Sequence, residues 1–440
     1  MSSHTTTVAP FQRAVPPNND RGEPEITPAV LLQPLDGEQL TNIASMQPHW
    51  NQPRINTWRL VAVFITFFNL GANDASYGLE TYYHLNYTVV SLIFLSPFAG
   101  YFFAAASSDK VHMQFGQRGV AIIGPLCRLA SYITFSLHPP WPVVVVILIF
   151  NGYGNGILDA GWNAWVGNMI GANQLLGIMH GFYGLGAVVS PLIATAMITK
   201  AALQWYTFFY VMCGLGVLEL VSGTWAFWEE TGAAFRRRNT NENGQGRLRA
   251  ALKHKVTWIC SLFLLLYVGC EVSIAGWIVT FMIRIRKGEP FASGITATGF
   301  WLGITLGRVS LGFLTPKLGE RLSVSFYLVI GVGLELLFWL VPNFIVSAIA
   351  VAFLGFFLGP MFPASIIAAT KLLPQHMHVA AIGFCSAVGG GGAAIVPFAV
   401  GAIAQVRGVE TLEPIVLALL VLLLGTWLTL PRMPRHSHQQ

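Results

Sequence analysis

The side chains best suited to chemistry lie within one apolar stretch, residues 143–166. Asn151, Asn155, Asp159 and Asn163 fall there at successive i, i+4 positions. This spacing places them along one slowly turning stripe of a helix. A carboxylate at bilayer depth costs at least about 2.5 kcal/mol unless it faces the protein interior, takes up a proton or pairs with a cation. Asp159 is therefore the first candidate for a functional group, and proton binding is the chemistry that suits it.

The composition indicates a chain that crosses a membrane many times. Of its 440 residues, 54% are hydrophobic and only 10% are charged, whereas soluble domains average about 25% charged residues. The net charge is +6, but the basic residues gather in alternate loops, which favours membrane topology over nucleic-acid binding. The five cysteines fall in or beside apolar stretches and are interpreted as small core residues, not as disulfides. The sequence contains no nucleotide-binding loop, metal-spaced His/Cys cluster or nucleophile triad, so we expect neither enzyme activity nor a cofactor or metal.

Twelve stretches reach the roughly 20 apolar residues that a membrane helix needs. They cover approximately residues 57–79, 88–108, 119–137, 141–168, 176–199, 205–228, 257–283, 293–315, 323–341, 343–370, 379–403 and 413–431. The sequence thus predicts an all-α membrane protein with twelve transmembrane helices in two six-helix bundles. The predicted units are a disordered tail (1–56), an N-terminal bundle (57–228), a basic linker (229–256), a C-terminal bundle (257–431) and a short tail (432–440).

The distribution of Lys and Arg predicts the orientation of the chain. Eighteen of the 25 lie in the tails and in the loops on their side of the membrane, and five lie on the opposite side. Because cytoplasmic loops are enriched in Lys and Arg, both termini are expected in the cytoplasm. The plasma membrane is the expected location. Asn86 begins the one glycosylation sequon, and we expect it to stay unmodified because it abuts a membrane helix.

The two halves repeat each other, which matters more than the number of helices. The offset between corresponding residues is 198 for the first and seventh segments, 203 for the fourth and tenth, and 206 for the fifth and eleventh. The matched residues include Gly71 with Gly269, Asn73 with Glu271, Gly152 with Gly355, and Gly184 with Gly390. Such a parallel repeat is typical of transporters that work by alternating access, with the site between the halves.

The chain resembles the major facilitator superfamily over residues 57–431. Residues 312–321, GFLTPKLGER, resemble the G-x-L-x-D-R-x-G-R signature of that superfamily, with Pro316 where an acid is usual. The first-half counterpart, from Asp109 to Gly119, is looser. Residues 184–191 resemble its Gly/Pro-rich motif.

Within the superfamily, the likeness is to the fucose:proton symporter-like branch, and to its fungal bypass-of-stop-codon protein 6 type. The branch carries an Asn-Asp pair, here Asn73-Asp74, and a G-x-G-x-x-acid-x-x-x-N motif, here residues 154–163. The resemblance implies that Asp74 and Asp159 are coupling acids and that the solute is a sugar or a similar polyhydroxy compound taken up with protons.

Other side chains are candidates for solute binding. Asn73, Asn155 and Asn163 could bind solute or join helices. Glu271 occupies the position in the second half that corresponds to Asn73 in the first, so it is expected to face the cavity. His180 could be a pH-sensitive cavity group or a structural histidine. Two indole rings, Trp162 and Trp277, and a cation, Arg128, complete the set. Arg128 is either the counter-ion of an acid, Asp159 among them, or a side chain reaching the interface.

Charges near the cytoplasmic ends predict a gate. Asp109, Arg118, Arg308, Lys317 and Arg321 could form a charge latch that holds one state. The alternative is ordinary positive-inside anchoring. Glu219 and Glu335 stand isolated in the sequence, and Glu335 has no evident role.

The expected activity is proton-coupled secondary transport of a small organic solute by a monomer in the lipid bilayer. Sugar uptake is one reading. Export of a less polar metabolite or drug is another, because aromatic residues are plentiful and the seventh and tenth segments offer few hydrogen-bonding groups. A membrane sensor that does not transport is a third.

Overall fold

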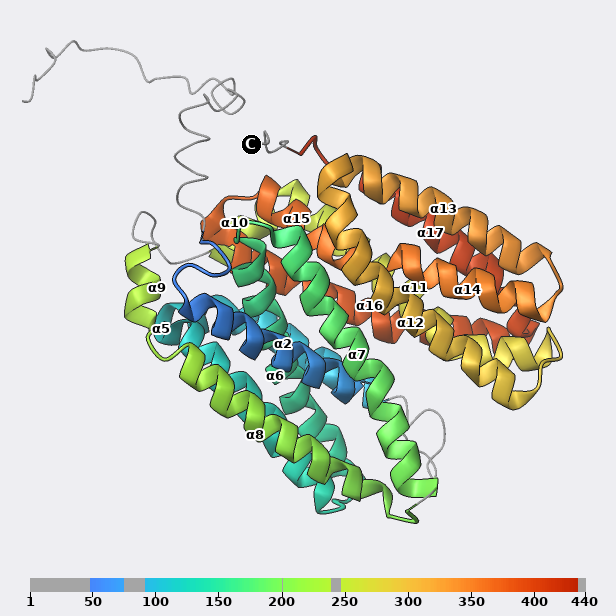
Figure 1. Cartoon of the computed structure of the whole chain (residues 1–440), viewed down its shortest axis with the longest axis horizontal. Coiled ribbons are helices and arrows are strands. Elements are labelled where there is room, and N and C mark those ends of the chain that lie inside the picture. The colour runs from blue at the N-terminus through green and yellow to red at the C-terminus, as the bar shows by residue number, and fades with distance from the viewer. Residues whose placement is uncertain (1–47, 75–91, 200, 239–246, 434–440) are drawn as a thin grey trace, which may run out of the picture. The chain divides into compact units, whose positions relative to one another are not determined.

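The computed structural model describes residues 48–74, 92–199, 201–238 and 247–433 (Figure 1). Asn86 and most of the predicted tails lie outside these ranges. The described chain is almost wholly helical. Eleven of its helical spans are long and apolar enough to cross a membrane.

The N-terminal bundle contains the first five of these spans. They are α2 (Ile55–Asp74), α5 (Leu92–Ser136), α6 (Trp141–Gly167), α7 (Ala172–Thr199), and η2 (Trp205–Thr207) with α8 (Phe208–Ala226). The apolar part of α5 runs for 42 residues, about twice the length that a bilayer needs. Its backbone is non-helical at Gly116, where φ is 69°, so α5 contains two of the predicted segments. The prediction of twelve membrane segments in two bundles is confirmed.

The C-terminal bundle contains the other six spans. Its first three helices are α11 (Lys255–Arg284), α12 (Pro290–Leu318) and α13 (Glu320–Leu340). The next span is broken into α14 (Phe344–Leu358) and α15 (Met361–Leu372). The last two are η3 (Gln375–Met377) with α16 (His378–Arg407), and η4 (Val409–Thr411) with α17 (Leu412–Leu428).

Two short helices occupy the region that the sequence predicts only as a basic linker: α9 (Gly232–Arg238) and α10 (Arg247–Lys253). Both pack against the bundle. A Cβ atom at Gly232 would lie 2.1 Å from the Gln114 carbonyl oxygen of α5, and Arg247 pairs with Asp109 at 3.5 Å. These contacts hold both short helices against α5.

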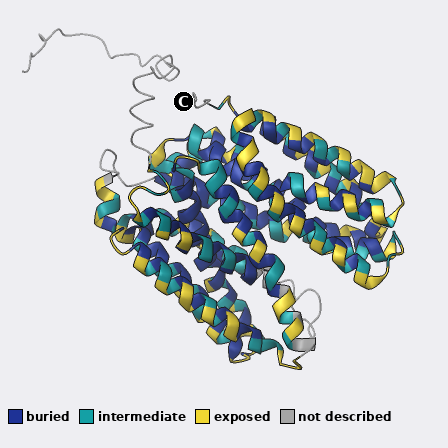
Figure 2. Ribbon diagram, in the orientation of Figure 1, coloured by how far each residue is buried: buried dark blue, intermediate teal, exposed yellow. Residues whose placement is uncertain are grey.

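Burial separates inner helices from outer ones (Figure 2). In α2 and α6, 61% of the most apolar window is buried, against 33% in α8 and α17. The outer helices therefore keep their apolar side chains on the bundle surface, as lipid-facing helices do. The polar stripe of α6 lies instead on one of the most buried helices, so it is positioned to serve a site within the protein.

Candidate functional site

The polar stripe of α6 divides into two hydrogen-bonded groups. In the first, Asn151 Nδ2 donates to Asn73 Oδ1 of α2 at 3.1 Å, and Asn155 Nδ2 donates to Asn151 Oδ1 at 3.2 Å. All three side chains are buried. Asn155 Oδ1 has no partner among the described residues, and a buried amide oxygen without one is costly. This group can accept one further hydrogen bond, from solute or water.

The second group contains the aspartate. Asn163 Nδ2 donates to Asp159 Oδ1 at 2.8 Å and to the Asp159 carbonyl oxygen at 2.9 Å. Asn163 Oδ1 lies 3.0 Å from His180 Nε2 of α7. Because an amide oxygen can only accept, His180 must carry a proton on Nε2. Asp159, Asn163 and His180 therefore form a chain with a fixed direction, which we call the acid–amide–imidazole chain.

This chain ends at the interface between the two bundles. The His180 ring lies 5.1 Å from the ring of Phe67 in α2 and 4.9 Å from that of Phe362 in α15. At the other end, a Cβ atom at Gly383 of α16 would lie 3.1 Å from Ala160 Cβ, the residue after Asp159. Both ends thus border the C-terminal bundle.

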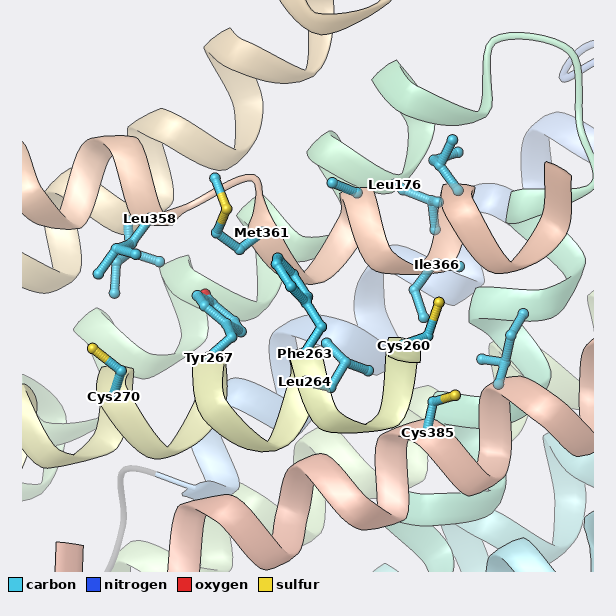
Figure 3. Packing of buried hydrophobic residues seen from close by; sticks show 14 of the residues in the cluster. Leu176, Cys260, Phe263, Leu264, Tyr267, Cys270, Leu358, Met361, Ile366 and Cys385 are labelled. Atoms are coloured by element: carbon cyan, nitrogen blue, oxygen red, sulfur yellow. The ribbon is translucent and has the colours of Figure 1, made fainter. Parts of the chain in front are cut away.

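The C-terminal bundle contributes a buried ion pair at the same interface. Arg308 Nη2 of α12 donates to Glu271 Oε1 at 3.0 Å and to the Tyr267 hydroxyl at 3.2 Å, both on α11. Arg308 Nε reaches the Gly359 carbonyl oxygen, at the break between α14 and α15. Figure 3 shows Tyr267 beside this break, which Leu358 and Met361 flank. The Gly359 carbonyl oxygen has no intrahelical donor, because the residue four positions on, Pro363, has no N–H.

Arg308 also faces the N-terminal bundle. Its Cζ atom lies 5.3 Å from the centre of the Tyr183 ring in α7, and its charge acts on His180. Arg308 Nη1 is buried without a hydrogen-bond partner in the described chain. The ion pair and the acid–amide–imidazole chain therefore lie close together at the interface between the bundles, where Arg308 has an unused donor.

The placement of Arg308 corrects the expectation that it belongs to a cytoplasmic latch. Lys317 and Arg321 lie 9 and 13 residues further on, and each helical residue adds about 1.5 Å. Lys317 is exposed and Arg321 half-buried at that end of the bundle, where Arg321 Nη2 donates to the Leu428 carbonyl oxygen at 2.8 Å. Arg308 is only 3% exposed and belongs with Glu271. Its bond to an acid could not be seen from sequence, because both helices carry polar residues on several faces.

Arg128 pairs with an acid, Glu219, for which the sequence predicted no partner. Arg128 Nη1 lies 3.3 Å from Glu219 Oε1, and both side chains are fully buried. Asn69 Nδ2 also donates to Glu219 Oε2 at 2.6 Å. A buried carboxylate needs such bonds to offset its desolvation. The described partner of Arg128 is therefore a structural one on α8.

The two candidate tryptophans pack within their own bundles. Trp162 is stacked on Phe227 with ring centres 4.5 Å apart, and Trp277 Nε1 donates to the Pro397 carbonyl oxygen at 3.3 Å. These contacts fill the bundle interiors. Asp74 is the last residue of α2, and its side chain lies outside what the structure describes.

Glu335 lies beside Glu413. Glu335 of α13 and Glu413 of α17 are at most 1% exposed, and their carboxyl groups are close enough to interact. Neither helix contributes to the site described above. This pairing was not predicted, because the two residues are 78 positions apart in the chain.

Contacts across the bundles gather at the end that carries the linker. His378 Nδ1 at the start of α16 lies 2.9 Å from Asn168 Oδ1 at the end of α6. Asn173 Nδ2 of α7 donates to Glu320 Oε1 of α13 at 3.0 Å, and Lys371 Nζ bonds the same oxygen at 2.5 Å. We call these five residues the interbundle latch; they hold this end closed.

None of the five residues of the interbundle latch is among those that the sequence predicted for a gate. Glu320 is part of the 312–321 motif, which was the one available signal. Asp109 pairs instead with Arg247 of α10, and Arg118 stacks on Trp228, with Cζ 5.1 Å from the ring centre. Both hold the linker region to the N-terminal bundle.

Adding a side chain at Gly177 should open this end. A Cβ atom there would lie 2.5 Å from the Arg308 carbonyl oxygen, and backbone atoms cannot move aside as a side chain can. We expect Gly177→Val to raise the maleimide labelling rate of a Thr370→Cys reporter severalfold in a cysteine-free background. Gly333→Val is the matched control, because no atom lies within 4 Å of a Cβ built there. Equal labelling of both variants would show that the α7–α12 contact does not close this end.

Two bundles of membrane helices with buried polar groups between them define an alternating-access transporter. Comparison with known proteins agrees. Residues 59–397 match the sequence model of the Major Facilitator Superfamily, and the chain belongs to this family.

Individual relatives give a finer picture. The chain is 28% identical to bypass of stop codon protein 6 of Saccharomyces cerevisiae, over 85% of this chain and 82% of that protein. It is 23% identical to the glucose/mannose transporter GlcP of Bacillus subtilis, over 76% of this chain and 85% of that protein.

Among solved structures, the fold is similar to that of the fucose:proton symporter FucP of E. coli. The TM-score is 0.67 at 15% identity, with 85% of this chain and 98% of that one covered. The fold is also similar to that of the proton:xylose symporter XylE bound to 6-bromo-6-deoxy-D-glucose. The TM-score is 0.68 at 13% sequence identity, with 87% of this chain and 97% of that one covered.

Proposed function

We propose that this transporter is a proton symporter for a sugar-like solute that binds between the bundles. The observation that carries the proposal is the acid–amide–imidazole chain, which extends from Asp159 through Asn163 to His180 at the interbundle face. A carboxyl group there is within reach of both a proton and a bound solute. Relatives described as glucose/mannose and fucose:proton transporters support the same class of substrate.

Asp159 is proposed to hold the transported proton. Asn163 keeps the carboxyl group oriented by donating to Oδ1, and its own orientation is fixed by His180. Protonation neutralises Asp159. The two bundles can then change their relative position without burying an unpaired charge between them. Deprotonation restores the charge and favours the state in which water can reach it. Asp74 is proposed as the second acid of the same cycle, on the strength of the motif that it shares with the branch.

The polar groups around the site match a polyhydroxy solute. Asn155 Oδ1 is an acceptor and Arg308 Nη1 a donor, and both are buried without partners in the described chain. Glu271 neutralises Arg308, so the pair offers hydrogen bonds without a net charge. A neutral solute with several hydroxyl groups can satisfy such a mixture of donors and acceptors. The indole rings expected to suit a less polar export substrate, Trp162 and Trp277, are used in packing.

Alternating access is proposed to proceed by opening the interbundle latch. The latch joins helix ends from both halves through two hydrogen bonds, Asn168 with His378 and Asn173 with Glu320. Its one ion pair, Lys371 with Glu320, lies within the C-terminal bundle. Glu320 and His378 are buried in this structure, so water must take over their hydrogen bonds when this end opens. We propose that the latched end faces the cytoplasm, in line with the distribution of Lys and Arg.

Transport into proteoliposomes tests the proposal. The purified protein is reconstituted with a pH-sensitive dye inside, and hexoses, pentoses, deoxyhexoses and a panel of less polar solutes are added in turn. We expect at least one sugar-like solute to acidify the lumen, at a rate that rises with an inward proton gradient. Protein-free liposomes are the control.

Two outcomes would contradict the proposal. If a solute enters without a change in lumenal pH, the transporter is not a proton symporter. If only the less polar solutes move, the substrate class is wrong.

A further inference from the structure

A groove on the outside of the N-terminal bundle is not used by the transport site. It lies between α5, the end of α8 and α9, and has a volume of about 670 Å³. Its lining residues are Gln114, Phe115, Arg118, Gly119, Ile122, Ile123, Trp228, Thr231, Gly232, Ala233 and Arg236. Figure 1 shows α9 beside the end of α5, at the outer edge of the bundle. The groove is therefore open to whatever surrounds the protein.

One end of the groove is positively charged. Arg118 donates from Nη1 to the Trp228 carbonyl oxygen at 3.3 Å and stacks on the Trp228 ring. Arg236 donates from Nη1 to the Met113 carbonyl oxygen. Each guanidinium has five N–H donors, and each of these two bonds uses one donor of its arginine. Both arginines therefore retain donors for an anion. Of the acids nearby in sequence, Glu230 is paired with Arg59 at 2.9 Å.

The other end continues into an apolar groove along the bundle. This second groove has a volume of about 470 Å³ and shares Ile122 with the first. Its other lining residues are Leu126, Leu220, Val221, Thr224 and Trp225. It is lined by helices α5 and α8, whose exposed side chains are apolar: Val221 is 61% exposed and Trp225 59%. Trp225 lines this second groove and Trp228 the first, and Trp58 lies beside Trp225 with ring centres 6.1 Å apart. All three are exposed, as in the aromatic belt at a membrane surface.

From this arrangement we propose that the two grooves together form a binding site for one anionic glycerophospholipid. The phosphate and the anionic headgroup lie between Arg118 and Arg236, and one acyl chain lies along Ile122, Leu126 and Val221. Arginine forks bind phosphate oxygens through paired N–H bonds. A soluble anion would not bind the apolar groove. A soluble protein partner could not reach it, because the lipid bilayer covers this face of α8. A lipid satisfies both ends at once.

Occupancy would also connect the linker to the bundle. Arg118 lies after the Gly116 break in α5 and Arg236 belongs to α9, so one headgroup bridges them. A bound lipid thus reinforces the contact between α9 and α5 that the short helix makes through Gly232.

Native mass spectrometry of the intact full-length protein tests this site. The protein in a neutral detergent is titrated with phosphatidylserine or with phosphatidylcholine of identical acyl chains. We expect one phosphatidylserine to be retained in preference to phosphatidylcholine. Each arginine near an anionic lipid contributes about 1 kcal/mol, so Arg118→Gln or Arg236→Gln should weaken retention about fivefold and the double variant roughly 25-fold. The matched control removes two arginines that do not line either groove, Arg249→Gln with Arg321→Gln, and should retain the lipid like the parent.

Two further arms separate a lipid from a free anion. Leu126→Trp fills the apolar groove without changing charge, and it should reduce retention severalfold while size-exclusion and circular dichroism profiles stay unchanged. Glycerophosphoserine at millimolar concentration should not displace the lipid. The proposal is overturned if the double arginine variant retains phosphatidylserine as the parent does, if phosphatidylcholine is retained equally, or if the soluble headgroup displaces the lipid.

Discussion

Asp159→Asn is expected to abolish proton-driven accumulation while leaving passive solute exchange in place. The amide keeps the shape of the carboxyl group and can still bond Asn163, but it cannot gain or lose a proton. One proton moving down 100 mV supplies about 2.3 kcal/mol, which sustains roughly a 50-fold solute gradient. The variant should therefore equilibrate solute to a ratio of about 1. Solute uptake and counterflow in proteoliposomes under an imposed gradient measure both properties.

The control for this variant is Glu229→Gln, the same acid-to-amide change at an exposed position near the linker. It should accumulate solute like the parent. Accumulation by Asp159→Asn with an unchanged dependence on pH would show that another group carries the proton. In that case Asp74, the second acid of the shared motif, becomes the candidate, and Asp74→Asn should then show the loss.

Arg308→Met is expected to destabilise the protein by about 3–5 kcal/mol, because it leaves Glu271 buried without its cation. Glu271 is 4% exposed and Arg308 3%, so water cannot replace the lost partner. The double variant Arg308→Met/Glu271→Leu removes both charges and should recover most of the stability. The unfolding midpoint in a denaturant series, monitored by tryptophan fluorescence, measures these differences.

The comparison also separates a structural role from a role in transport. Arg321→Met, which removes a half-buried arginine that is bonded to one carbonyl oxygen and has no acidic partner among the described residues, should cost less than about 1 kcal/mol. If the ion pair also binds solute, the stable double variant should still fail to transport. A double variant that is as unstable as Arg308→Met would contradict the buried-pair argument, and one that transports normally would remove the pair from the substrate site.

The transport site and the lipid site lie on opposite sides of the same bundle. The acid–amide–imidazole chain faces the C-terminal bundle through His180 and Phe362. The proposed lipid site lies on the outer surface, between α5, α8 and α9. Failure of one proposal therefore leaves the other standing, because no residue belongs to both.

The membrane segments and the polar stripe were predictable because both depend on local rules. A helix needs about 20 apolar residues to cross a bilayer, and residues four apart share one face whatever surrounds them. Asn155, Asp159 and Asn163 could thus be placed on one stripe from their spacing alone. Positive φ at Gly116 was not predictable in this way, because it depends on how the chain there meets its neighbours. The break after Leu358 lies at Gly359-Pro360, a local signal that the prediction of one segment over residues 343–370 did not use.

The partners of these residues were decided only by tertiary packing. The sequence left Glu219 isolated and assigned Arg308 to a cytoplasmic latch, whereas packing pairs Arg128 with Glu219 and Arg308 with Glu271. The hydrogen bond between Asn168 and His378 spans 210 residues. Helix geometry determines which side chains share a face, but the rotation and depth of each helix against its neighbours determine what that face meets. The sequence by itself therefore determined a two-bundle transporter with a buried acid, and the tertiary structure decided how that acid is held and which charges surround it.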